Sequence, residues 1–169
     1  MYRELKERGY KCVIDYEGDD MPGLNSSQEL VKRVSIVNNL QQQLGRCIYV
    51  SIHVNAAGNG KEWKNATGWC IYTCKGVTKS DKLADCIYLQ AKEYLTPLGK
   101  KLRTDFSDGD ADQEENFYVL YHTNCPAVLT ENFFQDCKSD VEWLRTDEAK
   151  QVLTTIHVEG IIDYLKTLS

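Results

Sequence analysis

The hydrophobic positions of this chain follow two spacings, one typical of helices and one typical of strands. Helix-forming residues, or apolar residues three or four positions apart, predict helices over 1–9, 26–44, 80–95 and 147–168. Short apolar runs predict strands over 12–16, 47–54, 67–74, 101–106 and 127–131. The run at 47–54 is nearly continuous and rich in β-branched residues, which indicates a central strand covered on both faces. Strands that alternate with helices favour a layered α/β fold around a mostly parallel sheet.

Capping signals place several helix ends. Ser26 and Glu29 have the spacing of a capping box, Asp147 is positioned to cap the last helix, and Gly9 stands where a helix-terminating glycine belongs. The first helix has no capping residue at its start, although the first backbone N–H groups of a helix need partners. We therefore interpret residues 1–9 as the last turns of a longer helix and expect the domain to be incomplete at its amino terminus.

Length and charge limit the class of protein. A chain of 169 residues suffices for one domain with a hydrophobic core, so we expect residues 1–169 to form a single domain. The net charge of −5 argues against a general nucleic-acid binder. Apolar runs of membrane-spanning length are absent, which predicts no membrane insertion, and the first thirty residues show no signal-peptide pattern. The sequence therefore assigns no compartment.

The acidic residues are concentrated in one segment. Six of them, and no basic residue, lie between positions 105 and 115. An EF-hand template that starts at Asp108 fails, because Gln113 stands where glycine is required and Val119 where the last glutamate is required. We therefore expect a solvated loop. The seven cysteines, an odd number without a Cys-x-x-Cys pair, favour reduced thiols.

Two predicted strands end in ionisable side chains. His53 lies within SIHVNAA after one strand, and Glu131 lies within PAVLTEN after another. Ligands of open α/β sheets bind beyond the carboxyl ends of the strands. A neutral histidine there can bind a metal, and a glutamate near apolar walls has the raised pKa that suits a general acid or base.

Other residues offer weaker alternatives. His122 and Cys125 form a single His-x-x-Cys pair, which we interpret as a surface connection rather than a zinc site, and His157 as a satisfied residue of the last helix. A Cys125 nucleophile paired with His53 is a further alternative. The aromatic residues include candidate sugar-stacking faces, although Trp69 lies in the middle of a predicted strand and is expected in the core.

The segments SIHVNAA and CPAVLTENFF, with the helix exit at Gly9 and Tyr10, resemble zinc-dependent N-acetylmuramoyl-L-alanine amidases of the amidase-3 type. The resemblance extends in consistent order through TGWCIYT, FYVLYHT and the last helix. It implies a three-layer fold with helices on both faces of the sheet. It also implies a peptidoglycan hydrolase that cleaves the amide between N-acetylmuramic acid and the L-alanine of the stem peptide.

By this resemblance, His53 corresponds to a zinc ligand and Glu131 to the catalytic glutamate, and Asn55 lines the substrate cleft. Zinc would polarise the scissile carbonyl and activate a water, and Glu131 would pass the water's proton to the leaving amine. The family's first zinc histidine, in a Gly-His-Gly-type loop, and its zinc glutamate have no counterpart here. The resemblance therefore implies an incomplete zinc site and a sheet that lacks its first strand.

The missing ligands also motivate a second hypothesis from another functional class. In it the chain is a non-catalytic amidase-like remnant that binds cell-wall glycan or a partner. An unrelated α/β binding domain with chance motif similarity is a third. The sequence does not determine the oligomeric state, the stem-peptide preference or a phage or bacterial origin.

Overall fold

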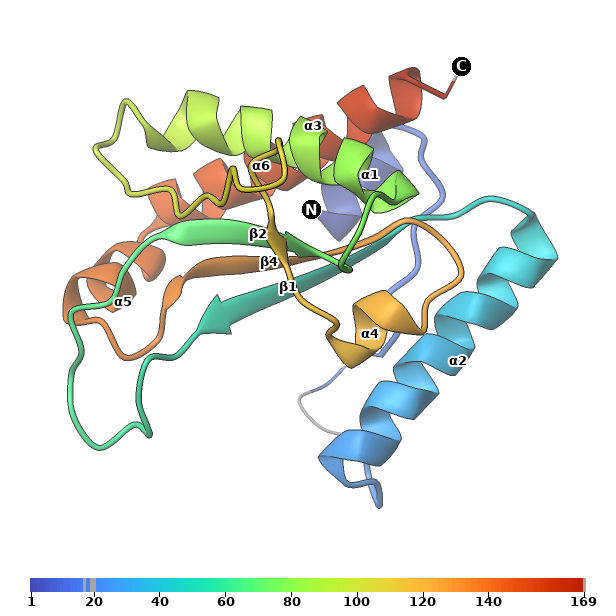
Figure 1. The fold of residues 1–169 in the computed structure, drawn as a ribbon, viewed down its shortest axis with the longest axis horizontal. Helices are drawn as coiled ribbons and strands as arrows, with labels where there is room; N and C mark the ends of the chain where they lie inside the picture. Colours follow the sequence, from blue (N-terminus) through green and yellow to red (C-terminus); the bar gives the residue numbers. More distant parts are fainter. Residues whose placement is uncertain (17, 19–20, 169) are drawn as a thin grey trace.

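The computed structural model describes residues 1–16, 18 and 21–168, in which a four-stranded sheet lies between two layers of helices (Figure 1). The strand order across the sheet is β1 (Tyr49–Asn55), β4 (Ala127–Phe134), β2 (Trp69–Thr73) and β3 (Gln113–Glu114). The pairs β1–β4 and β2–β3 are parallel, and β2–β4 is antiparallel. The predicted α/β fold is confirmed, with a mixed sheet. Within the described residues, the structure contains no helix with the length and hydropathy of a membrane span.

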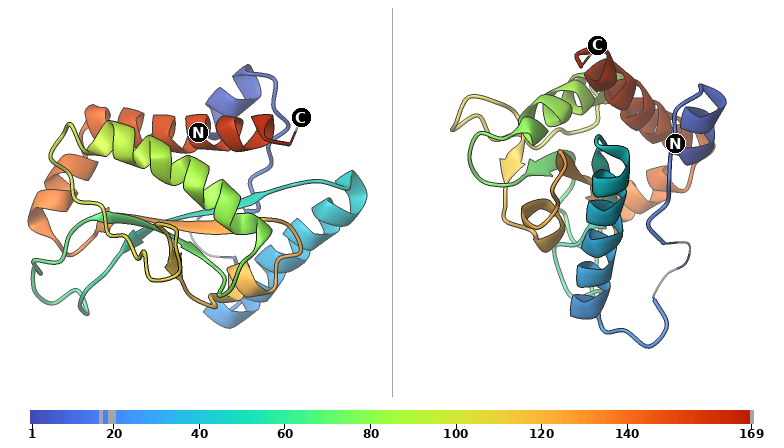
Figure 2. Two further views of the ribbon diagram at one scale, coloured as in Figure 1. Left: turned by 45° about the horizontal axis from the view of Figure 1, so that its top comes forward. Right: turned by 90° about the vertical axis from the view of Figure 1, so that its right-hand side faces the viewer.

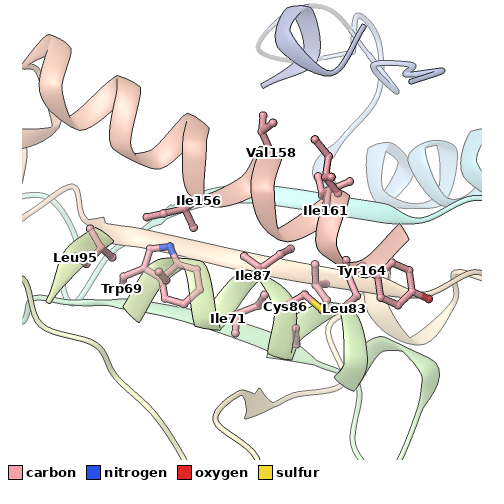
Figure 3. Close-up of a cluster of buried hydrophobic side chains, with 14 of the residues drawn as sticks. Trp69, Ile71, Leu83, Cys86, Ile87, Leu95, Ile156, Val158, Ile161 and Tyr164 are labelled. Carbon is pink, nitrogen blue, oxygen red and sulfur yellow. The ribbon is translucent and has the colours of Figure 1, made fainter. Parts of the chain in front are cut away.

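One face of the sheet is covered by α3 (Lys79–Leu95) and α6 (Asp147–Lys166), which pack along each other (Figure 2). Between them and the sheet lies the main hydrophobic core, which includes Trp69, Ile71, Leu83, Ile87 and Ile156 (Figure 3). The predicted helix over 80–95 is confirmed, with Leu83, Ile87 and Ala91 buried, and Trp69 is buried as expected.

The opposite face is covered by α2 (Ser26–Leu44) and the short α4 (Tyr118–Tyr121). Val34 of α2 and two residues of α4 form a second buried cluster with Ala127 and Leu129 of β4. The cluster ends at Leu129. Helices therefore cover the first half of β4 on this face, and no residue of the cluster comes from the second half.

The segment that follows α1 (Tyr2–Glu7) is not the buried strand that we predicted. Residues 12–16 are assigned to no strand, and Val13 is 63% exposed. An apolar run becomes a strand only where another strand offers backbone partners, and the described sheet stops at β1. Beside this segment is a hollow of about 700 Å³, also lined by Tyr49 and Val50 of β1 and by Leu40 of α2.

The prediction of a central strand covered on both faces is likewise wrong for 47–54. The strand begins at Tyr49 and lies at the edge of the sheet, with Ile52 49% exposed. The strand that occupies a central position is β4, which has partners on both sides. The run at 101–106 forms a single bridge, from Leu102 to Trp69, in place of a strand.

Two helix caps lie one residue before the predicted ones. Asn25 caps α2 and forms a capping box with Gln28, and the carboxylate of Glu29 instead accepts from the backbone N–H of Met21. Thr146, not Asp147, caps α6. In each case, the residue just before the predicted cap also has an oxygen that can accept from the first turn.

The acidic segment is only partly solvated, which corrects our expectation. Asp112 is 3% exposed, accepts a hydrogen bond from the Thr73 hydroxyl at 2.5 Å, and lies near the Asp110 carboxyl. One oxygen of each carboxyl is buried without a partner among the described residues. Burial, with the neighbouring carboxylates of Asp110 and Asp81, raises the pKa of Asp112 to about 7.

We expect Asp112→Asn to stabilise the protein at pH 8. Because the pKa of Asp112 is about 7 when folded and near 4 when unfolded, the free energy of unfolding decreases as pH rises from 4 to 7 and stays low above 7. An asparagine can accept from Thr73 and donate to Asp110 without this penalty. Urea unfolding should therefore show a higher midpoint for the variant at pH 8, with the advantage lost near pH 4. The exposed Asp108→Asn serves as control, and lower stability of Asp112→Asn at pH 8 would contradict the account.

Candidate active site

The structure brings His53 and Glu131 side by side. They are paired directly across the parallel ladder of β1 and β4, and neighbouring strands lie about 4.8 Å apart. Residues in register on parallel strands project to the same face of the sheet. Figure 1 shows that β1 and β4 run side by side. The two residues are far apart in sequence, and their pairing places an imidazole and a carboxyl on one surface of these strands.

The face that they share is the one that α2 partly covers. Leu129, two residues before Glu131, packs in the cluster with α2 and α4. Thr130, which points the other way, hydrogen-bonds His157 of α6 at 2.9 Å. Because side chains alternate along a strand, Glu131 projects toward the side of α2, beyond the end of the cluster.

Glu131 is half-buried and lacks a strong partner. Its Oε2 atom is buried and has no hydrogen-bond partner among the described residues. Burial raises the pKa of Glu131 to about 7, and the positive charge of Arg103 opposes part of that rise. A carboxyl with a pKa near neutrality can both accept and return a proton at physiological pH, which is what a general base requires.

Arg103 and Cys70 complete the surroundings of Glu131, and neither was expected from the sequence. Cys70 pairs with Glu131 across β2 and β4, and the Arg103 guanidinium lies 3.6 Å from the Cys70 sulfur and 5.2 Å from the centre of the Phe134 ring. The Arg103 side chain passes closely over Gly68, where a Cβ atom would lie 2.9 Å from its Cγ. Arg103 lies within the predicted strand 101–106, but no motif marks it as a site residue, so only the tertiary structure places it here.

His53 is exposed, and one ring nitrogen lies 2.9 Å from the Ser51 hydroxyl. Partial desolvation and the nearby charge of Arg33 lower its pKa, which favours the neutral imidazole. Neutral imidazole is the form of histidine that binds metals. The side chain is therefore in a protonation state suited to the ligand role that the sequence suggests.

A polar row leads away from His53 along β1. Tyr49 lies on the same face and donates to the Asp15 carboxylate at 3.1 Å, and Arg33 of α2 forms an ion pair with Asp15 at 3.0 Å. Burial and the Asp15 charge raise the pKa of Tyr49 to about 12, so its hydroxyl stays protonated. The row joins α2 and the segment after α1 to the strand that carries His53.

Asn55 lies two residues beyond His53, where the ladder is irregular. Asn55 pairs with Phe134. Asn55 is two residues after His53, whereas Phe134 is three residues after Glu131, so β4 contains one extra residue at this point. Its side-chain oxygen accepts from the N–H of Ala56, and its backbone carbonyl accepts from the N–H of Gln135 at 2.8 Å. Asn55 thus fixes the exit of β1 beside the site, and the structure shows no further role for it.

The alternative sites are not assembled. His122 is exposed and stacks on Tyr118, as expected for a surface connection, and His157 is buried between Thr130 and the carbonyl of Leu153. Cys125 is buried before the start of β4, and His53 pairs six residues further along, roughly 20 Å away. A Cys125–His53 catalytic pair is therefore excluded. All seven cysteines are free thiols, as predicted.

We tested whether these side chains could hold a zinc ion. In the part of the chain that the structure describes, no three His, Cys, Asp or Glu side chains gather as metal ligands. A catalytic zinc usually has three protein ligands and a water. His53 and the unpartnered carboxyl of Glu131 suit the edge of such a site, but the described residues alone do not form one.

Comparison with known proteins decides the family. Residues 1–163 match the model of the N-acetylmuramoyl-L-alanine amidases, the amidase-3 type. The chain belongs to this family. The match covers His53, Asn55 and Glu131 together, and it confirms the resemblance inferred from the sequence motifs.

The chain is shorter than individual relatives in this amidase family. It is 30% identical over 138 residues to the endolysin of Bacillus phage SPP1, and the alignment covers 81% of this chain and 45% of the endolysin. It is 32% identical over 157 residues to an uncharacterized cell wall amidase of Bacillus anthracis, and this alignment covers 92% of this chain and 27% of that protein. The chain therefore spans less than half the length of both relatives.

A solved structure supports the fold. The catalytic domain of CwlV, an N-acetylmuramoyl-L-alanine amidase from Bacillus (Paenibacillus) polymyxa var. colistinus, superposes with a TM-score of 0.71 at 23% identity. The superposition covers 97% of this chain and 78% of that domain. The central sheet with flanking helices is thus the amidase fold.

Proposed function

We propose that this chain is part of a peptidoglycan hydrolase that cleaves the amide between N-acetylmuramic acid and the L-alanine of the stem peptide. The observation that carries the proposal is the pairing of His53 with Glu131 on one face of the sheet, in a chain of the amidase family. Peptidoglycan or its muropeptides are therefore the proposed substrate. Neither nucleic acid nor a membrane is part of the proposal.

In this proposal Glu131 moves the protons. Its carboxylate accepts a proton from the attacking water and returns it to the nitrogen of the leaving alanine, so one group serves first as base and then as acid. Because Oε2 is buried, the other carboxylate oxygen contacts that water in this proposal. Arg103, on the same face, helps to keep a fraction of Glu131 ionised near neutral pH.

We propose Zn²⁺ as the cofactor, with His53 as one ligand. A bound zinc ion would polarise the scissile carbonyl and make the water more acidic. The other two ligands implied by the family resemblance have no counterpart in the sequence, so in this proposal they come from polypeptide outside it. The described chain alone should bind zinc weakly.

The unpaired edge of β1 offers a place for such polypeptide. Tyr49 donates its N–H toward β4, so the backbone groups of Val50 and Ile52 point to the outer edge. The structure shows no backbone hydrogen bond from these groups to any described residue on that side. The hollow beside this edge lies between two extended segments, which is the shape that an added strand would fill.

The direct test compares this chain with a version extended before Met1 by the corresponding segment of the SPP1 endolysin. We expect the extended version to hold about one zinc per molecule and to clear a suspension of purified peptidoglycan. His53→Ala in that version should lose most of the zinc, and the exposed His122→Ala should not. Stoichiometric zinc in the 169-residue chain would refute the claim that its site is incomplete.

The remnant hypothesis stays a second candidate because the described residues lack a complete metal site. It predicts that the chain binds peptidoglycan or a partner protein and that the extended version releases nothing. Sedimentation of the chain with insoluble peptidoglycan, measured with clearing of the same suspension, separates the two. Binding without clearing by the extended version would favour the remnant.

A further inference from the structure

An exposed tryptophan lies on the loop between β1 and β2. Trp63 is 61% exposed, whereas Trp69 is buried in the core and Trp143 is half-buried. Single exposed apolar side chains are common on protein surfaces, so exposure alone indicates no function. The surroundings of Trp63 are more informative than its exposure.

The loop is fixed at both ends by Asp136, which is 6% exposed. The Asp136 carboxylate accepts from the backbone N–H of Ala57 at 2.9 Å and from that of Gly58 at 2.7 Å. Its backbone carbonyl accepts from the N–H of Lys64 at 2.7 Å. Because both ends of the segment 57–64 are bound to one buried residue, the loop presents Trp63 from a fixed base, as compact Ω-loops do.

Trp63 borders a hollow of about 700 Å³ with mixed chemistry. The lining residues include Asn59 and Gln135, which have amide side chains, and Glu62, which has a carboxylate. An aromatic face beside a few hydrogen-bonding groups is suited to a flat ligand with polar edges. A pyranose ring has this character, with apolar C–H groups on its face and hydroxyl or N-acetyl groups on its rim.

The hollow lies beyond the carboxyl end of β1, the strand that carries His53. Gln135, on its lining, donates its N–H to the carbonyl of Asn55 at 2.8 Å, and Asn55 lies two strand residues, roughly 7 Å, beyond His53. In Figure 1 the loop extends below the sheet, on the side where α2 lies. His53 and Glu131 project toward that same side, so one elongated substrate can contact both places.

We propose that the loop 57–64, held by Asp136, is a sugar-binding subsite in which Trp63 stacks on an N-acetylated sugar of the glycan strand. This inference rests on the proposed function, because it assigns the glycan part of that substrate to a place beside the bond that is cut. Asp136 is a positioning residue that acts through the loop. Asn59, Glu62 and Gln135 supply hydrogen bonds to the rim of the ring.

The test measures the binding of a tetramer of N-acetylglucosamine to the 169-residue chain by NMR. We expect saturable shifts of the Trp63 indole N–H and of residues 57–64, in the wild-type chain and equally in Glu131→Gln. Trp63→Ala should weaken binding by at least about tenfold, since it removes the stacking face. Asp136→Ala, which releases the loop, should weaken it as well while Trp63 remains present.

Phe106→Ala is the matched control, because Phe106 is 62% exposed and is not part of the lining of this hollow. It should leave binding unchanged. Undiminished binding by Trp63→Ala, shifts confined to other surfaces, or no saturable binding by the wild-type chain would each overturn the inference. Since binding is measured without hydrolysis, an extended version that clears peptidoglycan without sugar binding would refute only the subsite. Sugar binding without clearing would refute only the proposed activity.

Discussion

Glu131→Gln should reduce peptidoglycan hydrolysis by the extended version about 10²- to 10⁴-fold, the usual contribution of a general acid–base group. Glutamine keeps the size of the side chain but cannot accept a proton from water. It also removes a half-buried carboxyl whose Oε2 has no partner. Stability above pH 7 should therefore not fall, so loss of activity cannot be attributed to unfolding.

The control for this prediction is Glu142→Gln, which changes an exposed carboxylate of α5 (Lys138–Leu144) that forms a surface ion pair with Lys138. Its hydrolysis rate should equal that of the unsubstituted protein. Zinc content should be the same in all three proteins, because Glu131 is assigned as the base and not as a ligand. Full activity in Glu131→Gln would remove the role assigned to Glu131.

Gly160→Ala should destabilise the fold, although alanine is the better helix former. Gly160 lies on α6 where it crosses α3, and a Cβ atom there would lie 2.6 Å from the Cα of Ile87. Because the atom that the new Cβ would meet belongs to the backbone of α3, it cannot move aside as a flexible side chain can, and the two helices must separate. Overpacking of this kind costs about 1–3 kcal/mol, which exceeds the gain of roughly 1 kcal/mol expected for glycine to alanine in an open helix.

The sign of the change decides this prediction. Urea unfolding of Gly160→Ala should give a lower midpoint, and Gly160→Leu should lower it further or prevent folding. Gln151→Ala, on an exposed position of the same helix, should change the free energy of unfolding by less than about 0.5 kcal/mol. An increase of about 1 kcal/mol for Gly160→Ala would show that the helices do not approach closely there.

Sequence patterns predicted the elements that build the site, and they predicted them for physical reasons. His53 and Glu131 each end a β-branched apolar run, and such runs form adjacent strands whose ends share one edge of the sheet. Burial raises the pKa of Glu131, in the direction that we predicted. The pairing of the two residues in register was not derivable, because register depends on the whole sheet.

The errors share a cause, which is that apolar runs do not specify their neighbours. The run at 12–16 has strand composition, but no strand among the described residues pairs with it. The run at 47–54 forms the edge strand of the described sheet. The charge of Arg103 acts on Glu131 from a segment with one bridge to the sheet, an arrangement that no local pattern encodes. Acidic segments are normally solvated, which is why we expected Asp112 to be exposed, but it is buried.

The central claim is that this fold cleaves one particular amide, and the chemical identity of the new ends in digested peptidoglycan tests it most directly. After digestion by the extended version, the free amino groups are labelled, the sample is hydrolysed, and the labelled amino acids are identified. Reducing sugar ends are counted in the same digest. The account predicts new amino-terminal alanine, no increase in reducing ends, and neither product with Glu131→Gln. New reducing ends, or new amino termini other than alanine, would contradict it.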